Sequence, residues 1–194
     1  TTNDESRKLI DAGRLQISPY NLEGDGFTAG VWDAGWAGNH SDLNYTGKRV
    51  VGDKGGSCGS CSVENHGTHV AGTLLGGGRR DSSYRGIAPE ATLATYEWPT
   101  SGSSELYEET NDSLVKYDST VSQNSWGFGY DECYLNQDYI YGDYDSWSRY
   151  YDKMIHGDTN KVEGTLSVVF SAGNERNNNC GSYNTTNFPS TAKN

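Results

Sequence analysis

The sequence lacks any apolar stretch close to the roughly 20 residues that a membrane-spanning helix needs, so a transmembrane protein is not expected. Basic residues are also few: 15 lysines and arginines stand against 26 acidic residues, which gives a net charge of −11. Because nucleic acids and anionic membrane surfaces attract basic patches, we expect neither as a partner. The polar first residues lack the features of a signal peptide, so an exported form would be a processed one.

Apolar side chains are scarce as well, at 33% of the chain, but the composition is not that of a disordered protein. Five tryptophans and 14 tyrosines can build a core, whereas disordered chains are poor in aromatic residues. At 194 residues, the chain has the size of one domain or of a part of a larger one.

Only four cysteines are present. Cys58 and Cys61 form a CxxC pair in a Gly/Ser loop, and not between a strand and a helix as a redox pair would. A zinc site would need a second such pair or suitably spaced histidines, and Cys133 and Cys180 stand alone. We therefore favour two structural disulfides, Cys58–Cys61 and Cys133–Cys180, over free thiols or a metal site. Disulfides would indicate an oxidising compartment, outside the cell or at its surface.

Short apolar runs alternate with helical patterns along the chain. The expected strands are residues 27–32, 49–51, 92–96, 120–125 and 166–171. The expected helices are residues 68–75, 105–117 and 146–156, with a short leading helix over residues 5–12. The run 166–171 is apolar enough to be covered on both faces, as in a parallel sheet. This alternation predicts an α/β fold with a mostly parallel sheet and right-handed crossovers.

Polar side chains stand at the ends of two predicted strands. Asp33 directly follows the strand 27–32, which places its carboxylate at the carboxyl end of the sheet, where open parallel sheets bind ligands. Asn174 follows the strand 166–171, and its side-chain amide can donate to an oxyanion there. Each has a simpler explanation when taken alone, because Asp and Asn are ordinary turn residues.

The segment HGTHVAGT, residues 66–73, places His66 just before a helix of small residues. Glycine costs a helix about 1 kcal/mol relative to alanine, so something other than propensity must favour this one. Gly67 and Gly72 allow close approach of the backbone. The alternatives are a capped helix with two ordinary histidines and a zinc pair of His66 with His69. The zinc pair is disfavoured because the HExxH spacing is absent.

Two further segments contain glycine. The strand that ends at Ser125-Trp126-Gly127 can pair with an extended peptide by β-augmentation, although this motif alone is weak. The run 76–78 is not a phosphate-binding loop, because it lacks the G-K-[ST] ending. An unrelated nucleotide-binding α/β domain is therefore the least favoured hypothesis.

Together these motifs resemble the subtilisin-like serine proteases, or subtilases. The matching segments follow the order and approximate spacing of that family: Asp33-Ala34-Gly35, HGTHVAGT at 66–73, GIAP at 86–89, NSWG at 124–127 and SAGNE at 171–175. The resemblance spans roughly residues 27–194 and departs at Ala34, where the family commonly has Ser or Thr. It implies a three-layer α/β fold in which helices cover both faces of a mostly parallel, twisted sheet.

The resemblance also implies roles for the matching residues in a secreted serine endopeptidase that forms an acyl-enzyme. His66 corresponds to the general base, Asp33 to the carboxylate that orients it, and Asn174 to the oxyanion-hole amide. The walls of the substrate pocket correspond to Ser125, Trp126, Gly127, Ser171, Ala172 and Gly173. The implied substrate is a peptide or protein, and no cofactor is expected to be required.

The family's serine nucleophile lies in a Gly-Thr-Ser-Met-Ala-x-Pro block that this sequence does not contain. We therefore expect residues 1–194 to be the N-terminal part of a single peptidase domain, with a fold that is incomplete without a C-terminal partner chain. That chain, separated by a cut after Asn194, would carry the serine. The alternative is an intact but catalytically inactive relative that binds peptides.

Calcium is the metal that the resemblance suggests, because the family often binds Ca²⁺ and Asp42 matches the position of a recurrent ligand. The nearby loop 76–85 carries Arg79 and Arg80, which would repel a cation, although Asp81 would offset them. A structural Ca²⁺ at Asp42 and an ordinary surface aspartate are therefore the two alternatives.

Overall fold

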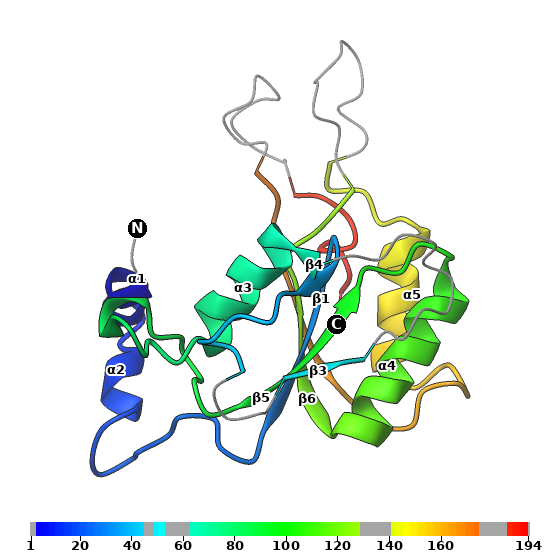
Figure 1. The fold of residues 1–194 in the computed structure, drawn as a ribbon. Coiled ribbons are helices and arrows are strands. Elements are labelled where there is room, and N and C mark those ends of the chain that lie inside the picture. Colours follow the sequence, from blue (N-terminus) through cyan, green and yellow to red (C-terminus); the bar gives the residue numbers. More distant parts are fainter. Residues whose placement is uncertain (1–2, 45–48, 53–62, 129–140, 175–185, 194) are drawn as a thin grey trace.

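The computed structural model describes residues 3–44, 49–52, 63–128, 141–174 and 186–193 (Figure 1). A five-stranded sheet lies at its centre, in the order β3-β5-β1-β6-β7, with every neighbouring pair parallel. The strands are β1 (Thr28–Asp33), β3 (Arg49–Val51), β5 (Thr92–Glu97), β6 (Ser119–Asn124) and β7 (Ser167–Phe170). Each agrees with a predicted strand to within one residue at either end, so the predicted parallel sheet is confirmed.

The helices are α1 (Asn3–Leu9), α2 (Ala12–Leu15), α3 (Asn65–Leu75), α4 (Ser103–Tyr117) and α5 (Ser146–Ile155), with a 3₁₀ turn, η1, at Ser82–Tyr84. The single leading helix expected over residues 5–12 is in fact two helices, because Asp11 adopts a left-handed conformation between them (φ 57°). A second parallel sheet, which the sequence does not predict, pairs β2 (Trp36–Ala37) with β4 (Val63–Glu64). None of the described helices is long and apolar enough to cross a membrane.

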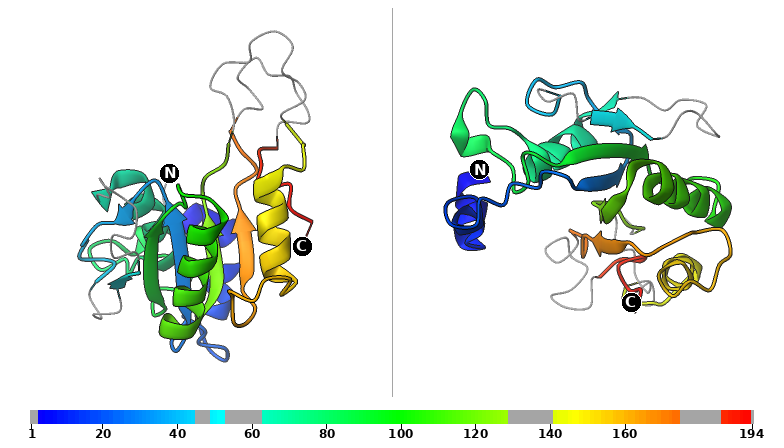
Figure 2. Two further views of the ribbon diagram at one scale, coloured as in Figure 1. Left: turned by 90° about the vertical axis from the view of Figure 1, so that its right-hand side faces the viewer. Right: turned by 90° about the horizontal axis from the view of Figure 1, so that it is seen from below.

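The central sheet carries helices on both faces. On one face α3 packs on β1 and β5, and on the other lie α4 and α5 (Figure 2). Successive side chains of a strand point to opposite faces. In β1, Val31 therefore joins the core under α3, whereas Trp32 joins the core under α4 and α5. The predicted three-layer α/β architecture is confirmed.

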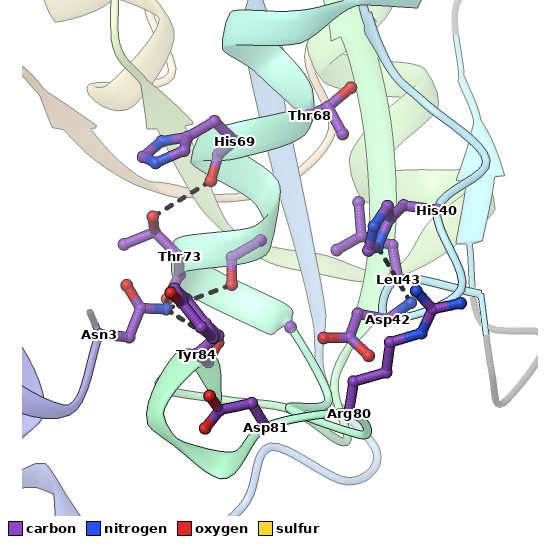
Figure 3. Close-up of a pocket in the computed structure, with 12 residues that line it drawn as sticks. Asn3, His40, Asp42, Leu43, Thr68, His69, Thr73, Arg80, Asp81 and Tyr84 are labelled. Atoms are coloured by element: carbon purple, nitrogen blue, oxygen red, sulfur yellow. Dashed lines mark hydrogen bonds between the residues drawn. The ribbon is translucent and has the colours of Figure 1, made fainter. Parts of the chain in front are cut away.

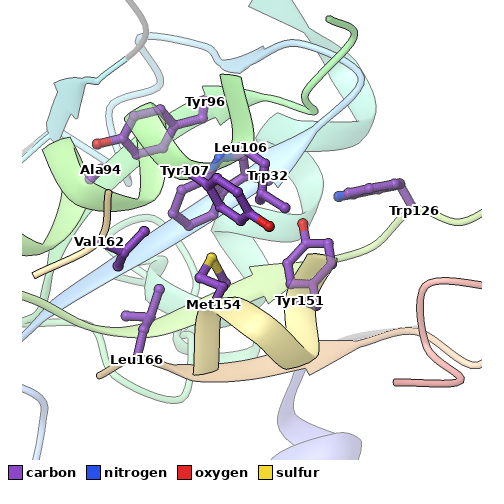
Figure 4. Packing of buried hydrophobic residues seen from close by; sticks show 10 residues of the cluster. All are labelled: Trp32, Ala94, Tyr96, Leu106, Tyr107, Trp126, Tyr151, Met154, Val162 and Leu166. Atoms are coloured by element: carbon purple, nitrogen blue, oxygen red, sulfur yellow. The ribbon is translucent and has the colours of Figure 1, made fainter. Parts of the chain in front are cut away.

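Aromatic side chains dominate the core between the sheet and the α4–α5 layer (Figure 4). Trp32 stacks on Tyr96 with ring centroids 4.5 Å apart, and its indole N–H donates to Glu109 at 2.9 Å. Trp126 is 6% exposed. It contacts the rings of Trp98, Phe128, Trp147, Tyr151 and Phe170. Large rings bury much apolar area per residue, which compensates for the low apolar fraction of the sequence.

The α3 face of the sheet is covered only in part by the described residues. No described helix packs on β6 and β7 on this face, where Val169 of β7 is 53% exposed (Figure 2). The adjacent Phe170 packs into the aromatic core on the other face. The expectation that the strand at 166–171 is covered on both faces therefore holds for one face only within the described chain.

Candidate active site

The candidate site lies where β1 ends and α3 begins. Asp33 is the last residue of β1, and its side chain is only 1% exposed. His66 is the second residue of α3, and its Nδ1 lies 2.7 Å from Oδ1 of Asp33. The imidazole is 59% exposed, so the ring reaches from a buried anchor to the surface. The structure thus brings together two side chains that the sequence places 33 residues apart.

The carboxylate of Asp33 determines which nitrogen of His66 carries the proton. An ionised carboxylate can only accept hydrogen bonds, so Nδ1 must donate. In the neutral ring the other nitrogen, Nε2, is then unprotonated and can take a proton. Oδ1 of Asp33 also accepts the N–H of Ala34 at 2.8 Å, whereas Oδ2 is buried without a hydrogen-bond partner in the described chain. The pair therefore combines a buried anion with a basic nitrogen on an exposed ring.

Hydrogen bonds of three other residues, Glu64, Thr68 and Trp98, hold the start of α3 and the end of β1 in place. The side chain of Glu64 accepts the first N–H of α3 at 3.0 Å. The hydroxyl of Thr68 donates to the carbonyl of Glu64 at 2.6 Å and accepts an N–H from the segment after β2 at 2.7 Å. The N–H of Trp98 donates to the carbonyl of Asp33 at 2.7 Å. The sequence does not single out these residues, since Glu is not a preferred capping residue, and the bonds of Thr68 with the segment after β2 and of Trp98 with Asp33 join distant segments.

The start of α3 differs from the prediction. The helix begins at Asn65 and contains His66 and Gly67, although the sequence pattern predicted a start at residue 68. Low helix propensity in this turn is offset by its packing against the end of β1. A Cβ on Gly67 would lie 2.7 Å from the carbonyl oxygen of Gly35 and 3.1 Å from Cβ of Asp33. Only glycine therefore permits this approach of α3 to Asp33.

Gly72 does not have the role that the sequence pattern suggests. A Cβ placed on Gly72 would have no described atom within 4 Å beyond its own helix backbone and chain neighbours. The expectation of close backbone approach is thus met by Gly67 and not by Gly72.

The predicted substrate segments lie at the same edge of the sheet as Asp33. Residues 125–127 follow β6, and residues 171–173 follow its neighbour β7. The N–H of Ser171 donates to the carbonyl of Asn124 at 3.0 Å, which joins the two segments. Asn174 comes directly after the second segment and is exposed. The edge therefore carries the segments expected to contact a peptide, together with the expected oxyanion donor.

The side chain of Trp126 lies away from the surface expected of a pocket wall. It is buried in the aromatic core, and its indole N–H donates to Oδ1 of Asn124 at 3.2 Å. Gly127 lies against residues 187–188, because a Cβ there would be 3.2 Å from Cβ of Asn187. The backbone of residues 125–127, and not the indole, is thus the part of this segment that can face a peptide.

The four cysteines are not part of the described chain. Cys58, Cys61, Cys133 and Cys180 all lie outside the described residues, so the two disulfides stay predictions. Within the described ranges, no group of three or more His, Cys, Asp or Glu residues is placed to hold a metal ion.

The central sheet is parallel, carries helices on both faces, and has at its carboxyl edge a histidine held by an aspartate. These features define an α/β protein with the His–Asp pair that serine hydrolases use. The sequence comparison makes the assignment more specific. The model of the subtilase family matches residues 24–194, and the chain belongs to this family. A search of curated protein sequences finds no match.

Solved subtilisin-like structures share the fold. MycP1 with its N-terminal propeptide removed is 17% identical, with a TM-score of 0.56 over 89% of this chain and 48% of its own. The CspB protease of Clostridium perfringens is also 17% identical, with a TM-score of 0.56 over 89% of this chain and 41% of its own. MycP1 from Mycobacterium smegmatis is 15% identical, with a TM-score of 0.54 over 89% and 45%. The chain thus spans less than half the length of these three proteins.

Proposed function

We propose that this chain supplies the general base of a serine endopeptidase, which hydrolyses peptide bonds in proteins through an acyl-enzyme. The observation that carries the proposal is the 2.7 Å contact between Nδ1 of His66 and Oδ1 of Asp33 at the carboxyl edge of the sheet. The exposure of the imidazole, at 59%, supports it because a base must reach its substrate. Membership of the subtilase family supports it independently.

In this mechanism, Nε2 of His66 takes the proton of a serine hydroxyl while the serine oxygen attacks the carbonyl carbon of the peptide. Asp33 keeps the ring in the required tautomer and stabilises the imidazolium that forms. The amide of Asn174 donates to the oxyanion of the tetrahedral intermediate. His66 then gives its proton to the leaving amine, and water hydrolyses the acyl-enzyme in a second cycle of the same proton transfers.

The substrate would lie in an extended form along the backbone of residues 125–127. Its side chain before the scissile bond would enter between this segment and residues 171–173. Both segments follow neighbouring strands, β6 and β7, at the same edge of the sheet. A peptide that pairs its backbone with such a segment is held by β-augmentation.

The serine would come from a C-terminal chain of the same protease. Val169 is exposed and no described helix covers the β6–β7 face, which supports this because apolar surface is left there for a further helix beside α3. β7 is the last strand of the described sheet, and it can therefore pair with another strand.

The segment 186–193 makes contacts that a two-chain form would need. This segment is anchored to α5: the Thr191 and Ser148 hydroxyls are 2.7 Å apart, and the N–H of Lys193 donates to Asp152 at 2.8 Å. Contacts of this kind would hold the segment in place after a nick. We further propose that the enzyme needs no cofactor and acts outside the cell or at its surface, where the predicted disulfides would form.

Active-site labelling tests this function. The purified protein should react with phenylmethylsulfonyl fluoride, and intact mass measured under denaturing, non-reducing conditions should place the label on a polypeptide other than residues 1–194. Label on a serine within residues 1–194 would refute the second chain. The absence of label on a verified two-chain sample would favour the inactive peptide-binding relative.

Asn174→Ala is expected to lower kcat by about 10²–10³-fold, because one donor to the oxyanion is lost. KM should change little, since the oxyanion forms only as the reaction proceeds. Steady-state kinetics on a peptide substrate measures both constants, and Asn44→Ala, at an exposed position, is the control. A rise in KM alone would instead assign Asn174 to ground-state binding.

Gly67→Ala is expected to lower kcat/KM by about 10²-fold, because the new methyl group pushes the start of α3 away from Asp33 and misplaces His66. Gly72→Ala is the matched control in the same helix. It should keep full activity and gain up to about 1 kcal/mol in the free energy of unfolding. Equal activity of the two variants would contradict the role given to Gly67.

A further inference from the structure

A cavity of about 480 Å³ lies between α3, the segment 40–43 and the loop 76–85 (Figure 3). Residues from four parts of the chain line it: Asn3 of α1, the segment 40–43 with Asp42, α3, and the loop 76–85 with Arg80 and Tyr84. Asp42 is the residue at which the family resemblance suggests Ca²⁺. The cavity therefore allows a test of whether the residues present fit that ion.

The described residues do not fit Ca²⁺, which takes six to eight oxygen ligands. Oδ1 of Asp42 accepts the backbone N–H of Arg79 at 3.1 Å, so a hydrogen-bond donor occupies the position that a cation would take. Asp81 caps η1 by accepting the N–H of Ser83 at 2.9 Å. The guanidinium of Arg80 lines the same cavity. Each of the two carboxylates thus accepts a backbone N–H, and an arginine lies in the same lining.

The side-chain amide of Asn3 joins α1 to α3 and η1. Nδ2 of Asn3 lies 3.5 Å from the carbonyl oxygen of Gly72, 3.4 Å from that of Thr73 and 3.3 Å from that of Tyr84. The first two carbonyls belong to the last turns of α3, and that of Gly72 also accepts the N–H of Gly76 at 2.9 Å. The third carbonyl ends η1. Figure 3 shows the Asn3 side chain directed at this group. One amide therefore faces carbonyl oxygens from two elements that lie 69 to 81 residues further along the chain.

We propose that the Asn3 carboxamide takes the place of a cation here and fastens α1 to α3 and the loop 76–85 without Ca²⁺. Convergent carbonyl oxygens need a positive partner, and the two N–H groups of a primary amide provide one. Asp42 contributes by holding the N–H of Arg79, which fixes the loop from its other side. The attachment of the N-terminal helix is consequently independent of metal.

Hydrogen–deuterium exchange of the intact protein tests this proposal, because it reports on peptides from α1 and the loop 76–85 separately and does not depend on activity. In the wild type, excess EDTA should leave exchange in both peptides unchanged. Asn3→Ala should increase exchange in both several-fold, and added Ca²⁺ should not restore it. Glu5→Ala, at an exposed position of α1, is the control and should resemble the wild type.

Two results would overturn the proposal. Faster exchange of the wild-type peptides in EDTA would show a metal at this junction, and loss of a bound Ca²⁺ in Asp42→Asn would identify its ligand. Unchanged exchange in Asn3→Ala would show that the amide does not hold α1. Either result leaves the proposed peptidase mechanism unaffected, since that is tested by labelling and kinetics.

Discussion

His66→Ala is expected to lower kcat by about 10⁶-fold, the scale of loss known for the catalytic histidine of subtilisin. The physical reason is that no other described group lies beside Asp33 to take the serine proton. The ring is 59% exposed, so its removal leaves little empty space in a core and the protein should remain folded. Peptide hydrolysis and thermal unfolding, measured on the same sample, check the two parts of this prediction.

His69→Ala is the matched control, since His69 is exposed on the same helix one turn further along. It should keep the activity of the wild type, which would show that loss of an imidazole from α3 is not harmful in itself. Full activity of His66→Ala would remove His66 from the mechanism. Equal loss in both variants would point to damage to α3 and not to loss of the base.

Asp33→Asn is expected to lower kcat by about 10⁴-fold with little change in the geometry of the site. An asparagine can turn its N–H₂ group toward Nδ1 of His66, which then becomes the acceptor, so the ring proton moves to Nε2. A ring with its proton on Nε2 cannot take the proton of a serine. The variant also lacks the charge that stabilises the imidazolium.

Nitrogen-15 NMR of the His66 side chain separates the two effects of Asp33→Asn, because it reports the tautomer directly. We expect the proton on Nδ1 in the wild type and on Nε2 in the variant. Asp158→Asn, at an exposed position, is the control for removing one negative charge. An unchanged tautomer together with wild-type kinetics would exclude Asp33 as the residue that orients His66.

The order of the elements could be read from the sequence because each signal is local. Strands such as Thr92–Glu97 are short apolar runs with polar or glycine-rich ends, and the helix Ser146–Ile155 shows a regular apolar stripe and an aspartate at its start. The structure adds that Asp145 caps that helix by accepting the N–H groups of Trp147 and Ser148. Local signals were weakest at the start of α3, where Glu64 and the packing of Gly67 outweigh propensity.

The aromatic residues show where a motif match can mislead. Trp126 belongs to a segment expected to line the substrate pocket, yet its indole is part of the core. The direction of a side chain depends on what packs beside the strand. For Trp126 that environment is made mainly by rings from three other segments, which include Trp98 and Phe170.

The sequence by itself determined the family, the order of strands and helices, and the residue types at the strand ends, because these depend on composition and on short-range spacing. Only the tertiary structure decided that Asp33 and His66 touch, that Gly67 and not Gly72 allows the approach, and that Asn3 faces the end of α3. These are contacts between distant segments. Their distances depend on how α3 packs against β1 and α1, which no local pattern encodes.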